Sequence, residues 1–380
     1  MKKLLPEVCT IQYGFPFDSA KFSDSNGMPL IRIRDVVRGY SETYTTEEYK
    51  SEYIVHENDL LIGMDGEFNI AKWGKTPALL NQRVCRLAPK DSIDKDYLFY
   101  FMPIALKRIE EKTPFVTVKH LSAKELNKIE IPVLSLEEQR KIAETLSKVD
   151  ELIAFREQQL AKLDELVKAR FVEMFGDLVA PQCEYPELKL VDICADADDI
   201  KCGPFGTQLN RDEYKAKGVA VWEIPQINSG FSEMPTHFIT EEKAVILNAY
   251  SIEPGDIAMS RKGNVGKCGL FPENLKKGII HSDVLRIRVD KRKVDSCFMM
   301  YQLHFSEAVK RQIEMVSSGA IMAGINVTKL KQIKVRIPEL ENQRMFAAFV
   351  ERVDQQKQTI QQSLEKLELL KKALIQEYFG

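Results

Sequence analysis

Leu136-Glu-Glu-Gln-Arg140 and Leu340-Glu-Asn-Gln-Arg344 lie in two copies of one segment of this chain. Residues 126–176 align with residues 330–380 at a constant offset of about 204 positions without a gap. About 19 of the roughly 51 aligned pairs are identical. A repeat of this length is one structural unit used twice. The sequence therefore predicts two related halves, with a different segment in front of each copy.

Each copy predicts a short strand, a turn and a long helix. Ile129-Glu-Ile-Pro-Val and Ile333-Lys-Val-Arg-Ile-Pro alternate apolar with polar residues and carry a proline, which is typical of an edge strand. Ser135 and the acidic residues after it favour a helix start. No Gly or Pro follows until Gly176 or Gly380. Roughly 38 uninterrupted residues at 1.5 Å each predict a helix of about 57 Å.

The apolar positions of both helices recur at heptad spacing, which predicts a coiled coil. The positions in the first helix are Ile142, Leu146, Val149, Ile153, Leu160, Leu163, Val167 and Met174. Those in the second are Phe346, Val350, Val353, Ile360, Leu364, Leu367, Leu374 and Tyr378. Arg156 and Arg170 interrupt the first seam, and Lys357 and Lys371 interrupt the second. Interruptions at different places favour pairing of the two helices with each other; the alternative is two amphipathic helices packed on separate domains.

The segments in front of the helices share a skeleton although they are much less alike. Short β-like runs separated by Gly, Asp and Asn turns dominate both segments. A shorter helix is expected near 96–111 in the first segment and near 295–315 in the second. The corresponding stretches are Gly14-Phe-Pro-Phe-Asp-Ser with Gly203-Pro-Phe-Gly-Thr-Gln, Gly27-Met-Pro-Leu-Ile-Arg with Gly218-Val-Ala-Val-Trp-Glu, Asn58-Asp-Leu-Leu-Ile-Gly with Gly255-Asp-Ile-Ala-Met-Ser, and Leu80-Asn-Gln-Arg-Val with Ile280-His-Ser-Asp-Val.

These features predict an α+β protein with two homologous, β-rich domains, each followed by a long helix. The expected boundaries are 1–134 and 188–338 for the domains, 135–176 and 339–380 for the helices, and 177–187 for a linker that contains Pro181 and Pro186. Segments of about 135 to 155 residues are long enough to form independent cores.

Composition narrows the class of protein. No apolar run is long enough to span a membrane, no signal peptide follows Met1, and seven cysteines without CxxC spacing indicate reduced thiols, so a cytoplasmic location is expected. The net charge of −2 is low for a nucleic-acid-binding protein. Basic residues nevertheless gather between Ala258 and Lys293, and a basic face there is compatible with DNA binding.

Catalytic motifs are missing. Gly263-Asn-Val-Gly-Lys-Cys lacks the spacing and the hydroxyl residue of a phosphate loop, and no GxGxxG occurs. The five histidines show no metal-binding spacing, and no Asn-Pro-Pro-Tyr-like motif of an amino-methyltransferase is present. Asp65 and Glu67 could share a site, although such a Gly-flanked pair more often serves a turn. The sequence predicts a protein that recognises rather than catalyses, without a cofactor or metal of its own.

Two variable domains, each followed by a copied helix with Leu-Glu-x-Gln-Arg near its start, resemble the specificity subunit of type I restriction–modification systems. The resemblance covers essentially the whole chain and includes the Pro-Phe-Gly-Thr-Gln loop at 204–208, the Pro-Leu-Ile-Arg-Ile-Arg-Asp run at 29–35, the Gly-Asp turn at 255–256 and both Phe-Gly ends. Residues 14–19 depart from the family's Pro-Phe-Gly-Ser loop.

The resemblance implies two target recognition domains that each read one half of an interrupted sequence in double-stranded DNA. It implies an antiparallel coiled coil that sets the gap between the halves. It further implies two DNA adenine methyltransferase subunits, which hold S-adenosylmethionine, and ATP-dependent restriction subunits as partners. The alternatives are a coiled-coil scaffold without DNA specificity and a fused methyltransferase–nuclease, the latter opposed by the missing catalytic motifs.

Polar residues expected at strand ends or in loops are the candidate base readers. Arg takes guanine bidentately, Asn and Gln suit adenine, and Glu accepts from cytosine. The candidates in the first domain are Arg32, Arg34, Glu67, Asn69, Gln82 and Arg83. Those in the second are Gln208, Gln226, Asn228, Arg261, Lys262, Asn264 and His281. Each of them has the alternative of being a phosphate contact or a solvated surface residue. Lys291, Arg292 and Lys293 are expected to contact the DNA backbone or solvent.

Overall fold

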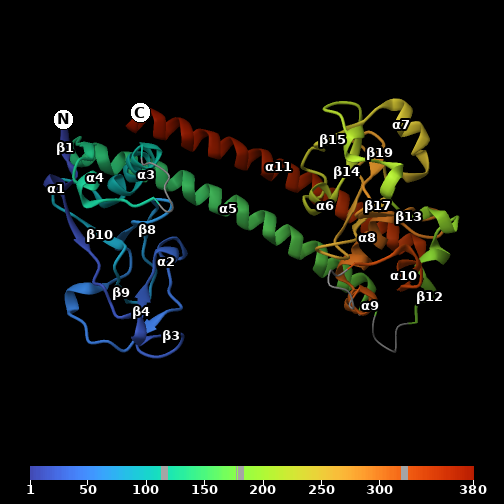
Figure 1. Ribbon diagram of the computed structural model, residues 1–380, viewed down its shortest axis with the longest axis horizontal. Helices are drawn as coiled ribbons and strands as arrows, with labels where there is room; N and C mark the ends of the chain where they lie inside the picture. The colour runs from blue at the N-terminus through green and yellow to red at the C-terminus, as the bar shows by residue number, and fades with distance from the viewer. Residues whose placement is uncertain (113–118, 177, 179–183, 318–323) are drawn as a thin grey trace. The chain divides into compact units, whose positions relative to one another are not determined.

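Two compact units make up the computed structural model, which describes residues 1–112, 119–176, 178, 184–317 and 324–380 (Figure 1). The first unit contains Met1–Gln158 and Gln361–Gly380, and the second contains Gln159–Ile360. Each unit therefore combines one of the variable segments with portions of both long helices. Both units mix sheets with helices, which confirms the predicted α+β class. Most of the expected linker at 177–187 lies outside the described residues.

The first unit contains two small sheets and a strand pair. The main sheet has the order β2 (Cys9–Tyr13), β10 (Val84–Pro89), β7 (Leu60–Gly63) and β8 (Ile70–Lys72). The second sheet has the order β3 (Phe22–Ser23), β5 (Tyr44–Thr45), β4 (Met28–Ile31), β9 (Ala78–Leu80) and β6 (Ile54–Val55). Strands β1 (Lys2–Leu4) and β11 (Glu130–Pro132) form the antiparallel pair. The short helices are α1 (Leu5–Val8), α2 (Ile33–Arg38), α3 (Lys95–Lys112) and α4 (Ala123–Leu126), with turns of 3-10 helix η1 (Ser19–Lys21) and η2 (Ser51–Tyr53).

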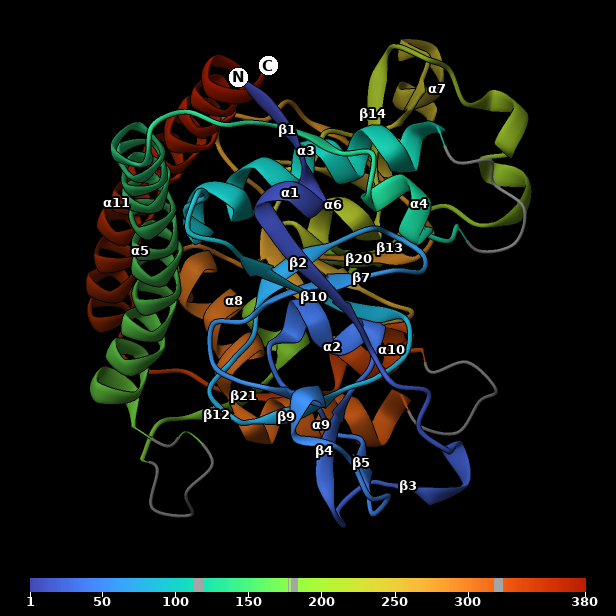
Figure 2. The ribbon, with the colours of Figure 1, turned by 90° about the vertical axis from the view of Figure 1, so that its left-hand side faces the viewer.

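The main sheet of this unit is buried on both faces. Successive side chains of a strand point to opposite faces. Leu60 and Ile62 of β7 pack in the core that α3 covers, whereas Leu61 between them packs with Trp73 and Val36 on the other face. Figures 1 and 2 agree in placing α3 and α4 beyond one end of this sheet and β4 beyond the other.

The second unit repeats this topology except for β3, which has no counterpart among its described strands. Its main sheet is β13 (Ile200–Cys202), β20 (Val284–Ile287), β17 (Ile257–Ser260) and β18 (Cys268–Leu270). Its second sheet is β15 (His237–Ile239), β14 (Val219–Trp222), β19 (Gly278–Ile280) and β16 (Ser251–Ile252), and β12 (Glu187–Lys189) pairs with β21 (Lys334–Arg336). Both second sheets contain one parallel pair, β4–β9 and β14–β19. The two variable segments are thus one fold.

Helices of the second unit follow the same order with three differences: the 3-10 turn η3 stands in place of α1, α7 is additional, and α3 is replaced by two helices. Where the first unit has the single helix α3, the second has α8 and α9, which are separated at Ser306, rather than the one helix expected near 295–315. The remaining elements are α6 (Ile224–Asn228), α7 (Glu241–Ile246), α8 (Ser296–Phe305), α9 (Glu307–Ser317) and α10 (Val327–Lys331), with 3-10 turns η3 (Leu190–Ile193), η4 (Ala197–Asp199), η5 (Gly206–Gln208), η6 (Arg211–Glu213) and η7 (Asn248–Tyr250).

The repeated segments form α5 (Leu136–Phe175) and α11 (Leu340–Phe379), which pair within each unit. In the first unit Lys371 Nζ lies 2.6 Å from Asp150 Oδ1, and in the second Lys357 Nζ lies 2.5 Å from Asp164 Oδ1. The later aspartate of α5 pairs with the earlier lysine of α11, so the helices are antiparallel. Asp150 and Asp164 are as far apart in the sequence as Lys357 and Lys371, so the register is the same in both units. The predicted pairing is confirmed, and the two lysines that interrupt the second seam are the residues that make these ion pairs.

The far end of each long helix completes a hydrophobic core. Phe379 of α11 is 5% exposed, and its ring lies 5.2 Å from Tyr97 of α3 in the first unit. Its counterpart in the repeat, Phe175 of α5, lies 4.8 Å from Phe298 of α8 in the second unit. Since α5 follows the first variable segment and α11 the second, each core is closed by the helix of the other half.

The start of each long helix is fixed by one buried glutamine. Gln139 and Gln343 occupy the same place in the repeat, and both side chains are fully buried. Gln139 Oε1 accepts from Asp94 N–H at 2.7 Å, and Gln343 Oε1 accepts from Asp295 N–H at 2.9 Å. Both aspartates cap the helix that follows them. The Gln of the Leu-Glu-x-Gln-Arg motif thus joins each long helix to the domain in front of it.

Neither disulfides nor membrane-spanning helices occur in the described part of the chain. All six cysteines described there are free thiols, and burial raises the pKa of the Cys85 thiol to about 12. None of the helices described is sufficiently long and apolar to traverse a membrane.

The reciprocal cores predict that the penultimate residue of the chain stabilises its N-terminal domain. Phe379→Ala removes a buried ring and should lower the free energy of unfolding of the first unit by about 3–5 kcal/mol. Hydrogen exchange followed by mass spectrometry should show faster exchange in α3, with α8 unchanged. Leu369→Ala, at a side chain that is mostly exposed on the same helix, is the matched control and should leave both helices unchanged. Equal protection of α3 in Phe379→Ala and wild type would contradict this packing.

Candidate DNA-recognition surface

Backbone hydrogen bonds bring four loops of the second unit together. Gly203 N–H donates to Val284 O at 3.2 Å, His281 N–H to Trp222 O at 2.9 Å, and Arg261 N–H to Asp283 O at 2.9 Å. The loops that follow β13, β14, β17 and β19 therefore meet at one place. These are the loops of the four stretches that the two variable segments share.

The first unit joins its loops through three such bonds, of which the first two correspond to bonds of the second unit. Gly14 N–H donates to Val84 O at 3.0 Å, Met64 N–H to Arg83 O at 2.9 Å, and Gln82 N–H to Phe15 O at 2.8 Å. Each unit thus presents one loop cluster, built on the same backbone and differing in side chains.

A glycine allows the closest approach in each cluster. A Cβ on Gly14 would lie 2.0 Å from Asn81 O, and a Cβ on Gly203 would lie 2.3 Å from His281 O. Both distances are far below van der Waals contact, so only glycine fits where the loop passes the end of the neighbouring strand. This explains why both shared loops begin with glycine.

The loop cluster of the first unit contains a group of three charged or titratable residues. Arg83 Nε lies 3.6 Å from Asp65 Oδ2, and His120 Nδ1 lies 2.5 Å from Asp65 Oδ1. Arg83 has φ +71°, a left-handed conformation that costs a residue with a Cβ roughly 1–2 kcal/mol. Strain of this kind persists where the surroundings impose it and gathers at functional sites.

The loop cluster of the second unit contains a longer chain of polar contacts. Lys262 Nζ lies 2.8 Å from Asp283 Oδ1, and Asp283 N–H donates to His281 Nδ1 at 3.2 Å. His237 Nδ1 lies 2.6 Å from Glu223 Oε2, and the His237 ring stacks on Tyr214 at 4.7 Å. These groups can offer several different hydrogen-bond donors and acceptors to a ligand.

The candidates of the first domain lie in three places. Glu67, Asn69 and Gln82 are exposed in loops, as expected. Arg32 caps α2, and Arg34 lies inside that helix, so the prediction of a strand end or loop was wrong for Arg34. The reason is Asp35, whose carboxylate accepts from Arg32 N–H at 2.8 Å and stabilises the helix start. Both arginines remain exposed.

The candidates of the second domain divide more sharply. Gln208, Lys262, Asn264 and His281 lie in the converging loops with at least part of the side chain accessible. Gln226 and Asn228 lie in the helix α6, not in a loop as predicted. Gln226 is 2% exposed, and its amide accepts from Glu223 N–H and donates to Met234 O. Its hydrogen-bonding capacity is therefore used within the protein.

The Arg261 side chain also makes its contacts mainly within the protein. Its guanidinium donates to Ile325 O at 3.1 Å and Ser282 O at 3.2 Å, and it lies over the ring of Phe205 at 4.8 Å. It thereby ties together three segments around the loop cluster. A buried or partly buried arginine of this kind is a scaffold for the exposed residues beside it.

The basic stretch 258–293 does not form one basic face. Arg286 is buried and donates to Ser251 O at 2.7 Å, and Arg288 pairs with Asp256 at 2.7 Å. The Arg292 guanidinium pairs with Asp290 at 2.9 Å and lowers the pKa of that carboxyl to about 2. Several cations of this stretch are therefore engaged within the fold and are not part of an unpaired basic face.

Sequence reasoning missed Asp283, His120, Glu223 and His237, and it offered Glu67 as the neighbour of Asp65, whereas the structure pairs Asp65 with Arg83 and His120. The available signal was positional. Asp65 and Lys262 each stand two residues after the third strand of the main sheet, and Arg83 and Asp283 each directly precede β10 and β20. Opposite charges at both aligned positions indicate an ion pair.

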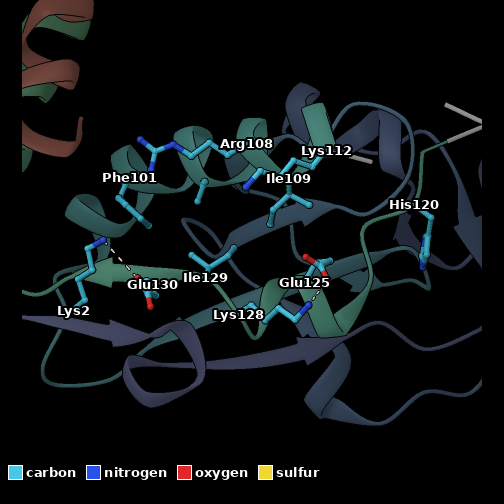
Figure 3. A pocket seen from close by; sticks show the side chains of 11 residues that line it. Lys2, Phe101, Arg108, Ile109, Lys112, His120, Glu125, Lys128, Ile129 and Glu130 are labelled. Atoms are coloured by element: carbon cyan, nitrogen blue, oxygen red, sulfur yellow. Dashed lines mark hydrogen bonds and ion pairs between the residues drawn. The ribbon is translucent and has the colours of Figure 1, made fainter. Parts of the chain in front are cut away.

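A cleft of about 750 Å³ borders the cluster of the first unit (Figure 3). His120 stands at one end, and Phe101, Ile109 and Ile129 contribute an apolar lining. Lys2 pairs with Glu130 at 3.5 Å and Lys128 with Glu125 at 2.8 Å. Arg108 and Lys112 of α3 also line it, and no acidic group in the described part of the chain is within ion-pair distance of either.

Metal chemistry has no support in the described ranges. They contain no group of three or more His, Cys, Asp or Glu side chains that could hold a metal ion. The histidine–carboxylate contacts of both clusters are therefore hydrogen-bonding arrangements.

Comparison with known proteins connects this geometry to a family. The model of the type I restriction modification DNA specificity domain matches residues 1–165 and 199–369. The EcoBI specificity subunit of Escherichia coli is 28% identical over 92% of this chain and 78% of its own length. The MjaVIII specificity subunit of Methanocaldococcus jannaschii is 24% identical over 91% of this chain and 87% of its own length.

Solved structures share the fold at low identity. The type I restriction–modification S subunit from M. genitalium has a TM-score of 0.61 at 17% identity and covers 100% of this chain and 96% of its own. A chain described in terms of complex assembly and conformational transition of the type I R-M system has a TM-score of 0.58 at 17% identity, with 100% and 97% covered.

The close approach at Gly203 predicts a sharp difference between two glycines of one loop. Gly203→Ala places a methyl group against the carbonyls of Ile280 and His281 and should cost about 1–3 kcal/mol of stability in the second unit. Gly206→Asn is the control, because nothing lies within 4 Å of its Cβ position and Asn tolerates its φ of +54°. Urea denaturation of both variants measures the effect. Equal stability of the two would show that the loop yields without cost.

Proposed function

We propose that this chain, which belongs to the type I restriction modification DNA specificity family, reads one half of a two-part DNA sequence with each of its two units. The observation that carries the proposal is the pair of loop clusters, built on one backbone but lined by different side chains. A shared scaffold with different polar loops is what recognition of two different sequences requires. We refer to residues 1–134 and 188–338 as the first and second recognition domains.

The exposed residues of the two clusters are chemically suited to different bases. The first domain offers Arg83, Glu67, Asn69 and Gln82, which match guanine, cytosine and adenine edges in the major groove. The second offers Lys262, Asn264, Gln208 and His281. Arg32 and Arg34 on α2 are proposed as further contacts, and the cations Arg108 and Lys112 in the cleft suit DNA phosphates.

The chain supplies recognition and its partners supply the reactions. We propose that it is not an enzyme and that it assembles with two DNA adenine methyltransferase subunits, joined in restriction by ATP-dependent subunits. S-adenosylmethionine and ATP would bind to those partners. Family membership and the name of the solved relative's system support an assembly of this kind.

The two long helices are proposed to set the gap between the half-sequences. Both helices cross from one unit's residues into the other's, and both are 40 residues long. Because the two helices pair antiparallel in a single register, both can be lengthened together without altering either loop cluster.

Exchange of the first recognition domain should change one half of the methylated motif. Residues 1–134 are the segment to replace with that of a relative, because it contains both β1 and β11, which pair with each other. Sequencing of methylated positions in a host that carries the hybrid and its modification subunits should show a new first half and the original second half. A change in both halves would mean that the domains do not read independently.

Lengthening both helices should lengthen the gap. The place for the insertion is after Gln158 and after Gln362, which correspond in the repeat and lie away from Phe171 and Phe175 in the core of the second unit. Four residues add about 6 Å and about 40° of rotation, close to one or two base pairs of about 3.4 Å each. The methylated motif should keep both half-sequences and gain one or two unspecified pairs.

The control for this test is the same insertion in α5 alone. It would move Asp164 past Lys357 by about one helical turn, break the antiparallel register and abolish activity. An active double insertion with an unchanged gap would contradict the role of the helices as a spacer.

A further inference from the structure

Each recognition domain carries an ion pair at the same two positions of the fold, with the charges exchanged. In the first domain the acid, Asp65, follows β7 and the base, Arg83, precedes β10. In the second the base, Lys262, follows β17 and the acid, Asp283, precedes β20. We call these two pairs the charge pairs.

Backbone bonds show that the positions are equivalent and not merely similar. Met64 N–H donates to Arg83 O and Leu121 N–H to Met64 O, each around the first charge pair. Arg261 N–H donates to Asp283 O and Ile325 N–H to Arg261 O around the second. Bridges also link Asp65 with His120 and Lys262 with Gly324. The same three backbone segments therefore hold both pairs.

The cation is the outer member of both charge pairs. The side chains of Arg83 and Lys262 are 54% and 44% exposed, whereas those of Asp65 and Asp283 are 23% and 27% exposed. The acid thus lies beneath, and the cation is presented to the surroundings. The element that presents it differs: the β9–β10 turn in the first domain and the β17–β18 loop in the second.

Histidines reinforce the acids from different directions. His120 contacts Asp65 at 2.5 Å, and its partner position in the second domain is Gly324, which has no side chain. His281 instead accepts from the backbone N–H of Asp283, and its Nδ1 lies 3.8 Å from Asp283 Oδ2; its counterpart in the first domain is Asn81. Each acid is therefore held by a second contact within its own domain.

Backbone conformation indicates that the arrangement around Arg83 is functional. Arg83 is held at φ +71°, and Asp283 is not among the described residues with positive φ. A left-handed arginine gains nothing for the fold, since Asn, Asp or Gly would occupy that conformation at lower cost. The strain is explained if the guanidinium must leave the turn in a particular direction.

We infer that the charge pair is the specificity-determining device of each recognition domain, in which the acid positions the cation against an acceptor-bearing base edge. This inference rests on the proposed DNA recognition. Asp65 and Asp283 are positioning residues, and Arg83 and Lys262 touch the DNA. Both cations suit the O6 and N7 acceptors of guanine, Arg83 through two bonds and Lys262 as a point charge. His120 positions Arg83 through Asp65.

The exchange of charges makes a direct test possible. The full chain with its modification subunits is measured for binding to a panel of duplexes that vary one position of the half-sequence at a time. Asp65→Asn should reduce the preference for guanine at one position about tenfold, with other positions and the salt dependence unchanged. Glu130→Gln, which breaks the Lys2–Glu130 pair of the same domain, is the matched control and should leave the base preference at every position unchanged.

The decisive variant exchanges the pair as a unit. Asp65→Lys combined with Arg83→Asp gives the first domain the charge order of the second, and Asp also tolerates the left-handed backbone better than Arg. This double variant should recover selective binding that Arg83→Asp alone loses by about tenfold or more. Asp283→Asn tests the same role independently in the second domain, and thermal unfolding confirms that each variant is folded.

Three outcomes would overturn the inference. Uniform loss on all duplexes with a smaller salt dependence would make Arg83 a phosphate contact. An Asp65→Asn preference equal to wild type would remove the positioning role, and a double variant no better than Arg83→Asp would remove the equivalence. Failure of the proposed function is distinct, because the wild-type complex would then show no sequence preference at all.

Discussion

The structure depends on the reciprocal closing of two hydrophobic cores. Phe379 ends the helix that follows the second domain yet packs on Tyr97 of the first, and Phe175 ends the helix that follows the first domain yet packs on Phe298 of the second. Burial of one such ring contributes about 1.5–3 kcal/mol. Neither domain has its complete core without the other half of the chain. This explains why both copies of the repeat have Phe at the end of the long helix.

The opposite ends of the helices are fixed by hydrogen bonds rather than by apolar packing. The buried amide of Gln139 makes three hydrogen bonds, and that of Gln343 makes two. Moving either amide would be costly because its buried partners would be left without a hydrogen bond. The amide therefore specifies one position for the start of the helix. Within each unit the backbone of the loop cluster is therefore supported by a defined core, and the side chains of the cluster are free to differ between domains.

The sequence predicted the helices and their pairing because the signal there is periodic. Heptad spacing and a gapless repeat depend on local regularity, and Lys357 and Lys371 already marked the seam positions that form ion pairs. The reciprocal packing was not foreseen, since Phe171 and Phe175 reveal which core they enter only through the antiparallel register. Register is a property of two segments together, and no single stretch encodes it.

Site prediction failed where local structure overrode composition. Arg34 was expected at a strand end or in a loop, but Asp35 stabilises a helix start there. Gln226 was expected to read bases, yet its amide holds the β14–α6 corner. The charge pairs were missed because their members lie about 20 residues apart in loops of low similarity, and only an alignment of the two segments brings the opposite charges to matching positions. The sequence did locate the four stretches that the two segments share, although it could not say that their loops converge or which side chains face outward.

Charge neutralisation within the chain bears on how it can recognise DNA. Affinity for DNA irrespective of sequence comes from unpaired cations that displace counterions from phosphates. Here the net charge is −2, and Arg286, Arg288 and Arg292 are engaged within the fold. A weak electrostatic attraction to DNA of any sequence means that binding at a wrong sequence gains little free energy. A directional contact from a cation that is held in place can then dominate the choice of DNA sequence. The acid beneath each cation contributes to sequence selection in two ways. It fixes the direction of the cation's contact, and it partly neutralises the charge that would attract DNA of any other sequence.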